Sequence, residues 1–339
     1  MEKLQEISFV LILALQQMSP ALDGVMNFFT FLGNIEFYLI IIPFIYWAVD
    51  KRLGIRLLLV LVTIYTFSSF LKLLFHQPRP YWLGRVLGLG AETSYGIPSS
   101  HSAGSFAVWG YLAYRLNKRW LWILISVFIF LIALSRLYLG VHFLHDVVFG
   151  WLAGFLVLWV FIKYEERVAG WADQRDMLFQ IGLGFVISIL MIVAGQSIQV
   201  WLAGISDPPE WSSFASQART PTYVFTLAGA LFGAVAGYVL MKRYAPFENG
   251  GSGLLQLARY VIGIILLLLL YSGLDVLFSI IAADETTLGY ALRYLRYASV
   301  TFLVTFVIPW IFIKLKLAKR ETDELGERIV RATTTGQKI

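Results

Sequence analysis

The sequence has no cysteine and few charged residues. Without cysteine the chain can form neither disulfide bonds nor thiolate metal sites. Only 14% of its 339 residues are Asp, Glu, Lys or Arg, whereas soluble domains carry about 25%. The N-terminus lacks a basic leader and a small-residue cleavage site, so we expect no cleavable signal peptide. Apolar residues make up 58% of the chain, which is typical of an integral membrane protein.

Long apolar segments recur along the chain and predict an all-α, polytopic membrane protein. Residues 1–34 hold two short apolar runs, which suit one kinked span or an interfacial helix with a short insertion; we expect the span. The polar stretch 163–177 divides the remaining spans into two groups. We expect these spans near 36–50, 53–75, 101–117, 119–139 and 143–164, then near 178–204, 221–241, 259–282 and 289–316.

The chain is thus predicted to have three regions, 1–165, 178–316 and a charged tail, 317–339. Most basic residues fall in alternate loops, so the net charge of +6 reflects orientation in a membrane rather than nucleic-acid binding. Basic loops face the cytoplasm, which predicts an inner (plasma) membrane protein with both termini cytoplasmic. The end of the 53–75 span then faces the periplasm or cell exterior.

His142 and Asp146 are four residues apart on an expected helix, so they share one face. A carboxylate beside an imidazole fixes its tautomer and raises its basicity, as a nucleophilic histidine requires. An ordinary hydrogen bond at a helix end would give the same spacing. Gly140, just before this pair, would allow a tight turn between two helices.

His101 follows Ser99 and Ser100 at the expected start of a span. A helix start offers free backbone N–H groups to an anion, and serine hydroxyls can cap the helix or bind phosphate. A histidine at this place could protonate a leaving alkoxide. The structural alternative is plain helix capping, with His101 at the headgroup level.

Three cations, Lys72, Arg79 and Arg136, lie at the same predicted face as these histidines. Arginine offers a planar fork to phosphate and lysine a compact charge, and fixed cations stabilise a phosphoryl transition state. Taken singly, Lys72 could snorkel to headgroups and Arg79 could belong to an ordinary turn. Together with two histidines and an acid, they indicate a phosphate site with a covalent catalyst.

These residues form three motifs that resemble the signatures of the type 2 phosphatidic acid phosphatase family. The resemblance implies a bacterial integral membrane member, with a six-helix core plus about four further transmembrane helices. It also implies hydrolysis without metal or other cofactor, through a phosphohistidine intermediate. The motifs are Lys72-x6-Arg79-Pro80, Pro98-Ser99-Ser100-His101 and Ser135-Arg136-x5-His142-x3-Asp146.

The same resemblance implies a role for each residue. His142 corresponds to the nucleophile, Asp146 to the acid that orients it, and His101 to the general acid and base. Position 100 is usually glycine in the family, and Ser100 can supply the same backbone N–H where no glycine-only conformation is needed. The implied phosphate ligands are Lys72, Arg79, Ser99, Ser100 and Arg136.

The predicted function is therefore an outward-facing lipid phosphate or diphosphate phosphatase in the bilayer. Undecaprenyl diphosphate, phosphatidic acid and phosphatidylglycerophosphate are its candidate substrates by resemblance. Three alternatives remain open: a lipid phosphotransferase, a lipid transporter or flippase that uses the later helices, and a non-catalytic lipid-binding subunit. A transporter predicts inverted repeats, yet no copy of the histidine or arginine motifs follows residue 165.

Several neighbouring residues are assigned structural roles. His145 is adjacent to Asp146, and adjacent residues on a helix face apart; no further acid cluster completes a set of ligands, so we expect no metal site there. In the loop after Lys72, His76, Tyr81 and Trp82 are expected to pack at the interface, and Glu92 is expected to be solvated.

The second group of spans carries two further features. A face of Gly229, Gly233 and Gly237 predicts close helix packing. Asp275 is an acid in an apolar span, and we expect it to pair with Arg293 or Arg296; a lipid-headgroup site is the functional alternative.

Overall fold

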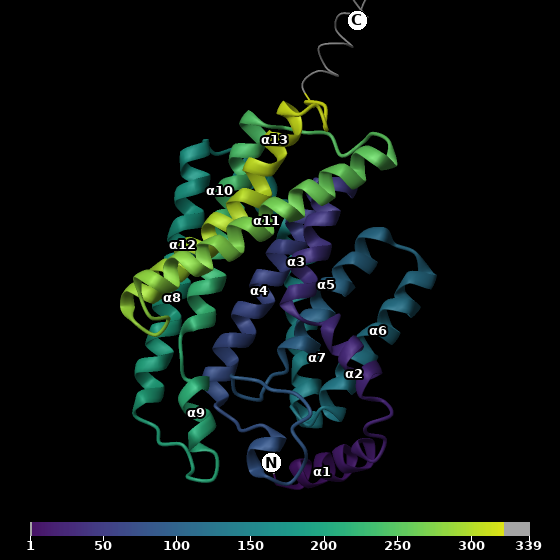
Figure 1. Cartoon of the computed structure of the whole chain (residues 1–339), viewed down its shortest axis with the longest axis vertical. Helices are drawn as coiled ribbons and strands as arrows, with labels where there is room; N and C mark the ends of the chain where they lie inside the picture. Colours follow the sequence, from purple (N-terminus) through teal and green to yellow (C-terminus); the bar gives the residue numbers. More distant parts are fainter. Residues whose placement is uncertain (1, 322–339) are drawn as a thin grey trace, which may run out of the picture. The chain divides into compact units, whose positions relative to one another are not determined.

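The computed structural model describes residues 2–321, which fold into helices joined by loops (Figure 1). Within this range the chain forms no sheet, and a single isolated bridge pairs Phe247 with Arg320. The predicted all-α fold is confirmed, while the tail from 322 onward lies outside the described residues. The helices are α1 (Glu2–Gln16), α2 (Asp23–Phe31), α3 (Ile35–Phe44), η1 (Ile45–Val49), α4 (Lys51–Phe75), η2 (Pro80–Leu83), α5 (Ser100–Leu116), α6 (Arg119–Tyr138), α7 (Leu144–Asp173), α8 (Met177–Ala203), α9 (Ser212–Ala218), α10 (Thr222–Tyr244), α11 (Gly253–Ile281), α12 (Thr287–Phe302), η3 (Leu303–Val307) and α13 (Ile308–Lys314).

Seven helical segments of the described range are long and apolar enough to cross a membrane. An eighth crossing results if α2 and the α3–η1 helix, bent by 53° at their junction, count as one span. α5 has 17 residues and is about 25 Å long, slightly less than a hydrocarbon core of about 30 Å. Four of the seven segments follow residue 176, in agreement with the four further spans expected from the sequence.

Residues 1–34 do not form the single kinked span expected from the sequence. α1 is a separate helix of 15 residues, about 22 Å long, which is too short to cross. The Ser8 hydroxyl accepts a hydrogen bond from the Leu144 backbone at 3.1 Å, and Gln16 donates to the Leu87 carbonyl at 2.8 Å. α1 therefore lies across the end of the bundle where α7 begins (Figure 1). The N-terminal helix shares this face, whereas the sequence placed the N-terminus on the face opposite the motif residues. Which face is cytoplasmic stays a prediction.

The chain divides into two compact units. Of the described residues, the first unit holds 2–39, 57–174 and 188–228, and the second holds 40–56, 175–187 and 229–321. Most of α8 and all of α9 thus pack with the helices that carry the three motifs.

Within the first unit, α5 and α7 approach closely at the ends that carry motif residues. A Cβ atom at Gly150 or Gly154 of α7 would lie 2.7 Å from the carbonyl of Ser99 or of Ala103, respectively. Glycine at both positions lets the two backbones come together. The Ser99 backbone also donates a hydrogen bond to the Asp146 carbonyl at 2.9 Å. The first turn of α5 therefore lies beside the first turn of α7.

Aromatic side chains hold α9 against the loop that follows α4. The Trp82 and Phe214 rings are stacked, with centroids 5.4 Å apart and planes at 7°. The ring centroids of Trp211 and Tyr95 lie 6.0 Å and 6.1 Å from that of Trp82, so the four rings form one cluster. Trp82 packs in this cluster as expected. The contact fixes a loop whose backbone carbonyls face the motif cations.

In the second unit, α10 and α12 pack through the predicted glycine face. A Cβ atom at Gly233 would collide with the Ala298 carbonyl, and one at Gly237 would collide with the Thr305 hydroxyl. Gly229 meets the Tyr294 carbonyl in the same way. The small-residue contact expected from the spacing is confirmed.

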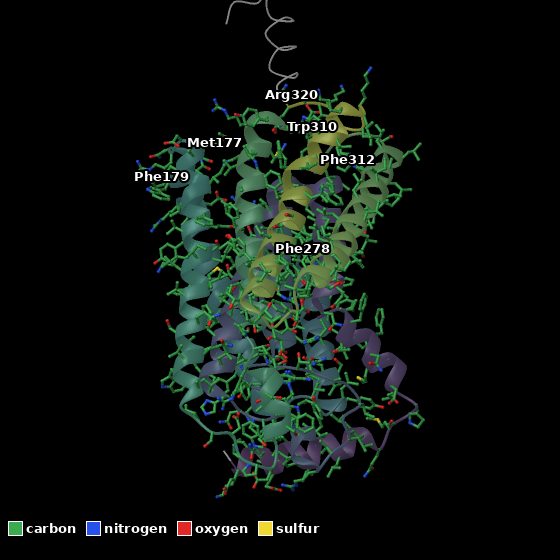
Figure 2. All side chains as sticks on the ribbon, turned by 60° about the vertical axis from the view of Figure 1, so that its left-hand side comes forward. Met177, Phe179, Phe278, Trp310, Phe312 and Arg320 are labelled. Carbon is green, nitrogen blue, oxygen red and sulfur yellow. The ribbon has the colours of Figure 1, made fainter. Side chains whose placement is uncertain are left out.

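The second unit also contains the expected ion pair of Asp275. Its carboxylate is bonded to Arg296, whose guanidinium lies 4.3 Å from the centre of the Tyr271 ring. The predicted structural pair is thus confirmed, with Arg296 as the partner. Elsewhere in this unit, Phe312 of α13, which Figure 2 labels, packs edge-on against Trp47 with centroids 6.0 Å apart.

Candidate active site

His142 and Asp146 pair across the turn that joins α6 to α7. Gly140 permits this turn, because its φ is +70° and a Cβ atom there would collide with the Leu87 carbonyl. His142 Nδ1 lies 3.2 Å from Asp146 Oδ2, which also accepts a hydrogen bond from the Phe143 backbone at 2.9 Å. Both side chains are buried. The predicted contact is present, but not on one helix face as expected, because α7 begins at Leu144 and His142 lies in the turn before it.

Arg79 contacts the other ring nitrogen of His142, with Nη1 3.0 Å from Nε2. Since a guanidinium can only donate, Nε2 presents its lone pair and Nδ1 carries the proton, which it donates to Asp146. Burial, together with the charges of Arg79 and Lys72, lowers the pKa of His142 below its usual range. The ring is therefore neutral at neutral pH, with the tautomer that a nucleophilic histidine needs.

Arg79 itself is fully engaged and almost completely enclosed, with 1% of its surface exposed. Its Nε donates to the Ser94 carbonyl at 2.6 Å, and Nη2 donates to the Ser94 hydroxyl at 3.0 Å. Nη1 additionally donates to the Val141 carbonyl at 2.9 Å. These bonds hold the planar fork in one orientation beside His142.

Lys72 and Arg136 reach the same cluster from α4 and α6. The Lys72 ammonium donates to the Tyr95 carbonyl at 2.5 Å, and Arg136 donates to the Thr30 hydroxyl. Lys72 is 6% exposed and Arg136 4%, so neither side chain snorkels to the headgroups. Arg136 Nε is buried without a hydrogen-bond partner in the described range. The cluster thus has donor capacity left over.

Glu92 links the cations, although the sequence suggested a solvated side chain. Its carboxylate is bonded to Arg136, lies 3.6 Å from Arg79 Nη2, and interacts electrostatically with His101 and Lys72. Burial acts to raise the pKa of Glu92, but Arg136 and Arg79 outweigh it and hold that pKa well below its usual range. The expectation was wrong because the loop folds back over the cations. One anion at this position can contact both guanidinium groups.

The first turn of α5 brings His101 to this cluster. Ser99 is the N-cap, and its buried hydroxyl accepts hydrogen bonds from Ser102. Ser100 is the first residue of the helix and does not have a positive φ, so this position needs no glycine. His101 Nε2 hydrogen-bonds the Asn34 side-chain oxygen. The predicted phosphate contacts of both serines stay predictions.

Sequence reasoning missed three polar residues of this site, Thr30, Asn34 and Ser94. Thr30 binds Arg136 and Asn34 binds His101. Thr30 and Asn34 are four residues apart, on either side of Gly33 at the end of an apolar run. This pair of polar side chains at a helix break was the available signal. Ser94 lies in an irregular loop and carried no pattern.

His145 lies beside the pair without joining a metal set. Its Nε2 is 3.4 Å from Asp146 Oδ1, and its ring stacks on Phe143 with centroids 5.2 Å apart. Among residues 2–321, no group of three or more His, Asp and Glu side chains is arranged to hold a metal ion. Metal independence stays a prediction.

Comparison with known proteins places these motifs in a family. Residues 53–169 match the PAP2 superfamily, and residues 225–320 match the transmembrane extension of PAP2 superfamily phosphatases. Phosphatidylglycerophosphatase B of Bacillus subtilis (strain 168) is 30% identical over 162 residues, which cover 44% of this chain and 78% of that protein. The chain belongs to the PAP2 superfamily. The predicted phosphatase class, a hydrolase, is thereby confirmed.

Two longer relatives extend the similarity over most of the chain. Sphingosine-1-phosphate phosphatase 1 of Rattus norvegicus is 27% identical over 311 residues, covering 84% of this chain and 70% of that protein. Glucose-6-phosphatase 3 of Homo sapiens is 24% identical over 347 residues, covering 91% and 95%. The helices after residue 178 are therefore part of the relationship to other PAP2 proteins.

Proposed function

We propose that this PAP2 protein removes the terminal phosphate from a lipid phosphate or diphosphate through a phosphohistidine on His142, without metal. The observation that supports this most strongly is the orientation of His142, whose Nε2 lies 3.0 Å from Arg79 Nη1. Asp146 holds the opposite nitrogen. A nucleophile so oriented, beside three buried cations, suits phosphoryl transfer.

In the first step, the substrate phosphate replaces Arg79 Nη1 at His142 Nε2, and its phosphorus atom receives the Nε2 lone pair. The Nε2–phosphorus bond forms as the bond from phosphorus to the lipid oxygen breaks. The charge of the bound phosphate favours the protonated form of His101, which gives its proton to that leaving oxygen. Lys72, Arg79 and Arg136 neutralise charge on the equatorial oxygens of the transferring group.

In the second step, neutral His101 takes a proton from water as the water oxygen attacks phosphorus. The bond from phosphorus to Nε2 breaks, and inorganic phosphate leaves. Asp146 stabilises the charge that His142 carries while phosphorylated. The balance is one lipid phosphate and one water converted to lipid alcohol and inorganic phosphate. With a lipid diphosphate, the bond that breaks is the one to the bridging oxygen, and the lipid product is the monophosphate.

Lipid phosphates are the proposed substrate class. The relatives named for sphingosine 1-phosphate and phosphatidylglycerophosphate support this, since both names denote membrane lipids with a terminal phosphate. The candidates remain phosphatidic acid, phosphatidylglycerophosphate and undecaprenyl diphosphate. The distribution of basic loops supports an outward-facing site in the inner membrane.

Phosphate release from a panel of these lipids in detergent, with EDTA present, tests the chemistry. Wild type should release phosphate from at least one lipid, and His142→Ala should lose nearly all of that activity. A quenched reaction with labelled substrate should trap label on the wild-type protein and none on the variant. Equal release from His142→Ala, or loss of release in EDTA, would contradict the mechanism.

Single cysteines test the orientation, because the chain has none of its own. Leu87→Cys, at a position 62% exposed in the loop after α4, should react with an impermeant reagent in intact cells. Glu6→Cys on α1 should react as well, while Lys242→Cys should react only after lysis. The reverse pattern would mean an inward-facing site.

A further inference from the structure

Glu92 is an anion among the side chains that are expected to bind phosphate. Its two carboxylate oxygens reach different cations: Oε1 is bonded to Arg136, and Oε2 lies 3.6 Å from Arg79. His101 and Lys72 complete its electrostatic surroundings. In the structure this carboxylate therefore takes the place of an anionic ligand.

The loop holds this carboxylate in position from both sides. The Tyr81 hydroxyl donates to the Glu92 carbonyl at 3.0 Å and accepts from the Glu92 backbone N–H at 3.3 Å. Two residues further on, Ser94 is bound by Arg79 through its carbonyl and its hydroxyl. The side chain is 21% exposed, so it lies at the edge of the cluster and has a path away from it.

We propose that Glu92 determines specificity by holding the cations until a dianionic phosphate displaces it, which excludes monoanionic phosphodiester headgroups. This inference rests on the proposed function, because it assumes that substrate phosphate binds at these cations. Coulomb attraction grows with the charge of the ligand. A phosphate monoester carries about −1.5 to −2 charges at neutral pH. A phosphodiester carries one charge, as Glu92 does.

Glu92 and a phosphodiester each carry one negative charge, and the covalent attachment of Glu92 to the chain favours Glu92 in the competition for the cations. Glu92 is attached to the protein, so its effective concentration at the cations is in the millimolar range or higher. A phosphodiester that replaced Glu92 at the cations would bring the same single charge, and its binding would also cost its own freedom of motion. A monoester gains further attraction from the remaining cations. The carboxylate thus discriminates by rejecting the wrong ligand, which matters in a bilayer made of phosphodiester lipids.

Glu92→Gln tests this, with Glu6→Gln as the matched control. Glutamine retains an oxygen that can accept a hydrogen bond from Arg136 but loses the charge. Glu6 pairs with Arg85 on the surface, so its substitution makes the same charge change away from the cations. Inorganic phosphate and dimethyl phosphate at pH 8 are the probes, since the first is mainly a dianion and the second a monoanion.

Thermal unfolding in detergent measures binding independently of turnover. Phosphate should stabilise wild type and the Glu6 control, and dimethyl phosphate should have little effect on either. Glu92→Gln should reach half-maximal stabilisation at a concentration of phosphate lower by about fivefold or more. Dimethyl phosphate should now stabilise this variant too. In mixed micelles, added phosphatidylglycerol should raise KM for Glu92→Gln and leave wild type unchanged.

Unchanged responses to both probes in Glu92→Gln would overturn the inference. Weaker phosphate binding in that variant would overturn it as well, because Glu92 would then order the cations rather than compete with phosphate. Glu92→Asp keeps the charge on a shorter side chain and should show intermediate binding, which covers the case in which the glutamine variant does not fold. Normal binding shifts without release from any lipid phosphate would instead count against the proposed function.

Discussion

Arg79 lies against the nitrogen of His142 that the proposed reaction uses, with Nη1 3.0 Å from Nε2. The guanidinium thereby orients the lone pair and occupies the place where a phosphorus atom would arrive. Four other hydrogen bonds of Arg79, to Ser94, Tyr95 and Val141, do not involve the imidazole. These bonds can hold the side chain close to the site while Nη1 moves aside from Nε2 to a phosphate oxygen.

Replacing Arg79 by lysine should lower kcat/KM by about 10²–10³-fold, because lysine keeps the charge but loses the planar fork. The variant should also lose the contact that orients Nε2. Steady-state kinetics with a soluble short-chain lipid phosphate measure the effect. Arg85→Lys is the matched control. Arg85 lies in the same loop as Arg79, but it is exposed and pairs with Glu6 of α1. Equal activities of the two variants would contradict the role of Arg79.

Replacing Asp146 by asparagine should lower kcat by about 10²–10⁴-fold with little change in KM. Asparagine has the same size but no charge, so it cannot stabilise the His142 ring when that ring carries the phosphoryl group. Its amide can also present a donor to Nδ1 and favour the wrong tautomer. Rapid-quench measurement of phosphoenzyme formation should show that the first step is slowed. A change confined to KM would point to a structural role.

The acidic limb of the kcat/KM profile should lie below pH 6.5, since burial and the nearby cations lower the pKa of His142 from its ordinary value of about 6.5. The neutral ring of His142 is the active form, so the acidic limb appears only as pH falls through this lowered pKa. The substrate itself ionises with a pKa of about 6, so rates should be expressed per concentration of its dianion. An acidic limb at or above pH 6.5 after this correction would contradict the assignment.

The spacing of four residues indicated a contact between His142 and Asp146, although not its geometry. His142 precedes α7, which begins at Leu144, so the turn at Gly140 and the start of α7, rather than one helix face, bring the two side chains together. The cations were predictable for a related reason, because ionisable residues at the ends of apolar segments require partners. The glycine face of α10 and the pair of Asp275 with Arg296 followed from the same local rules.

Features that depend on the path of a loop were not predictable. Glu92 was expected in solvent, yet it contacts cations that are 13 and 44 positions away in the sequence. α1 was expected to cross the bilayer, whereas Gln16 fastens it to Leu87 on the face that holds the site. Both outcomes depend on contacts between distant segments, for which sequence periodicity carries no signal.

Replacing Asp275 by asparagine should lower stability by about 1–2 kcal/mol and leave catalysis unchanged. Arg296 is largely buried and loses its charged partner, but Asp275 is 59% exposed, which reduces the expected cost. Asp284→Asn is the control, because that carboxylate is 73% exposed where it meets Arg293. Thermal unfolding in detergent should separate the two variants. A loss of activity in Asp275→Asn at full stability would favour a lipid-headgroup role.

Replacing Gly233 by alanine should destabilise the second unit by about 1–3 kcal/mol or more. The added methyl group would collide with the Ala298 carbonyl and the Thr301 hydroxyl, and a backbone atom cannot move aside as a flexible side chain could. Gly273→Ala on α11 is the matched control, because nothing lies within 4 Å of a Cβ atom there. That change should be neutral or slightly stabilising, since alanine favours helix more than glycine does. Fluorescence-monitored unfolding of both variants measures the difference, and equal stability would mean that α10 and α12 are not packed backbone to backbone.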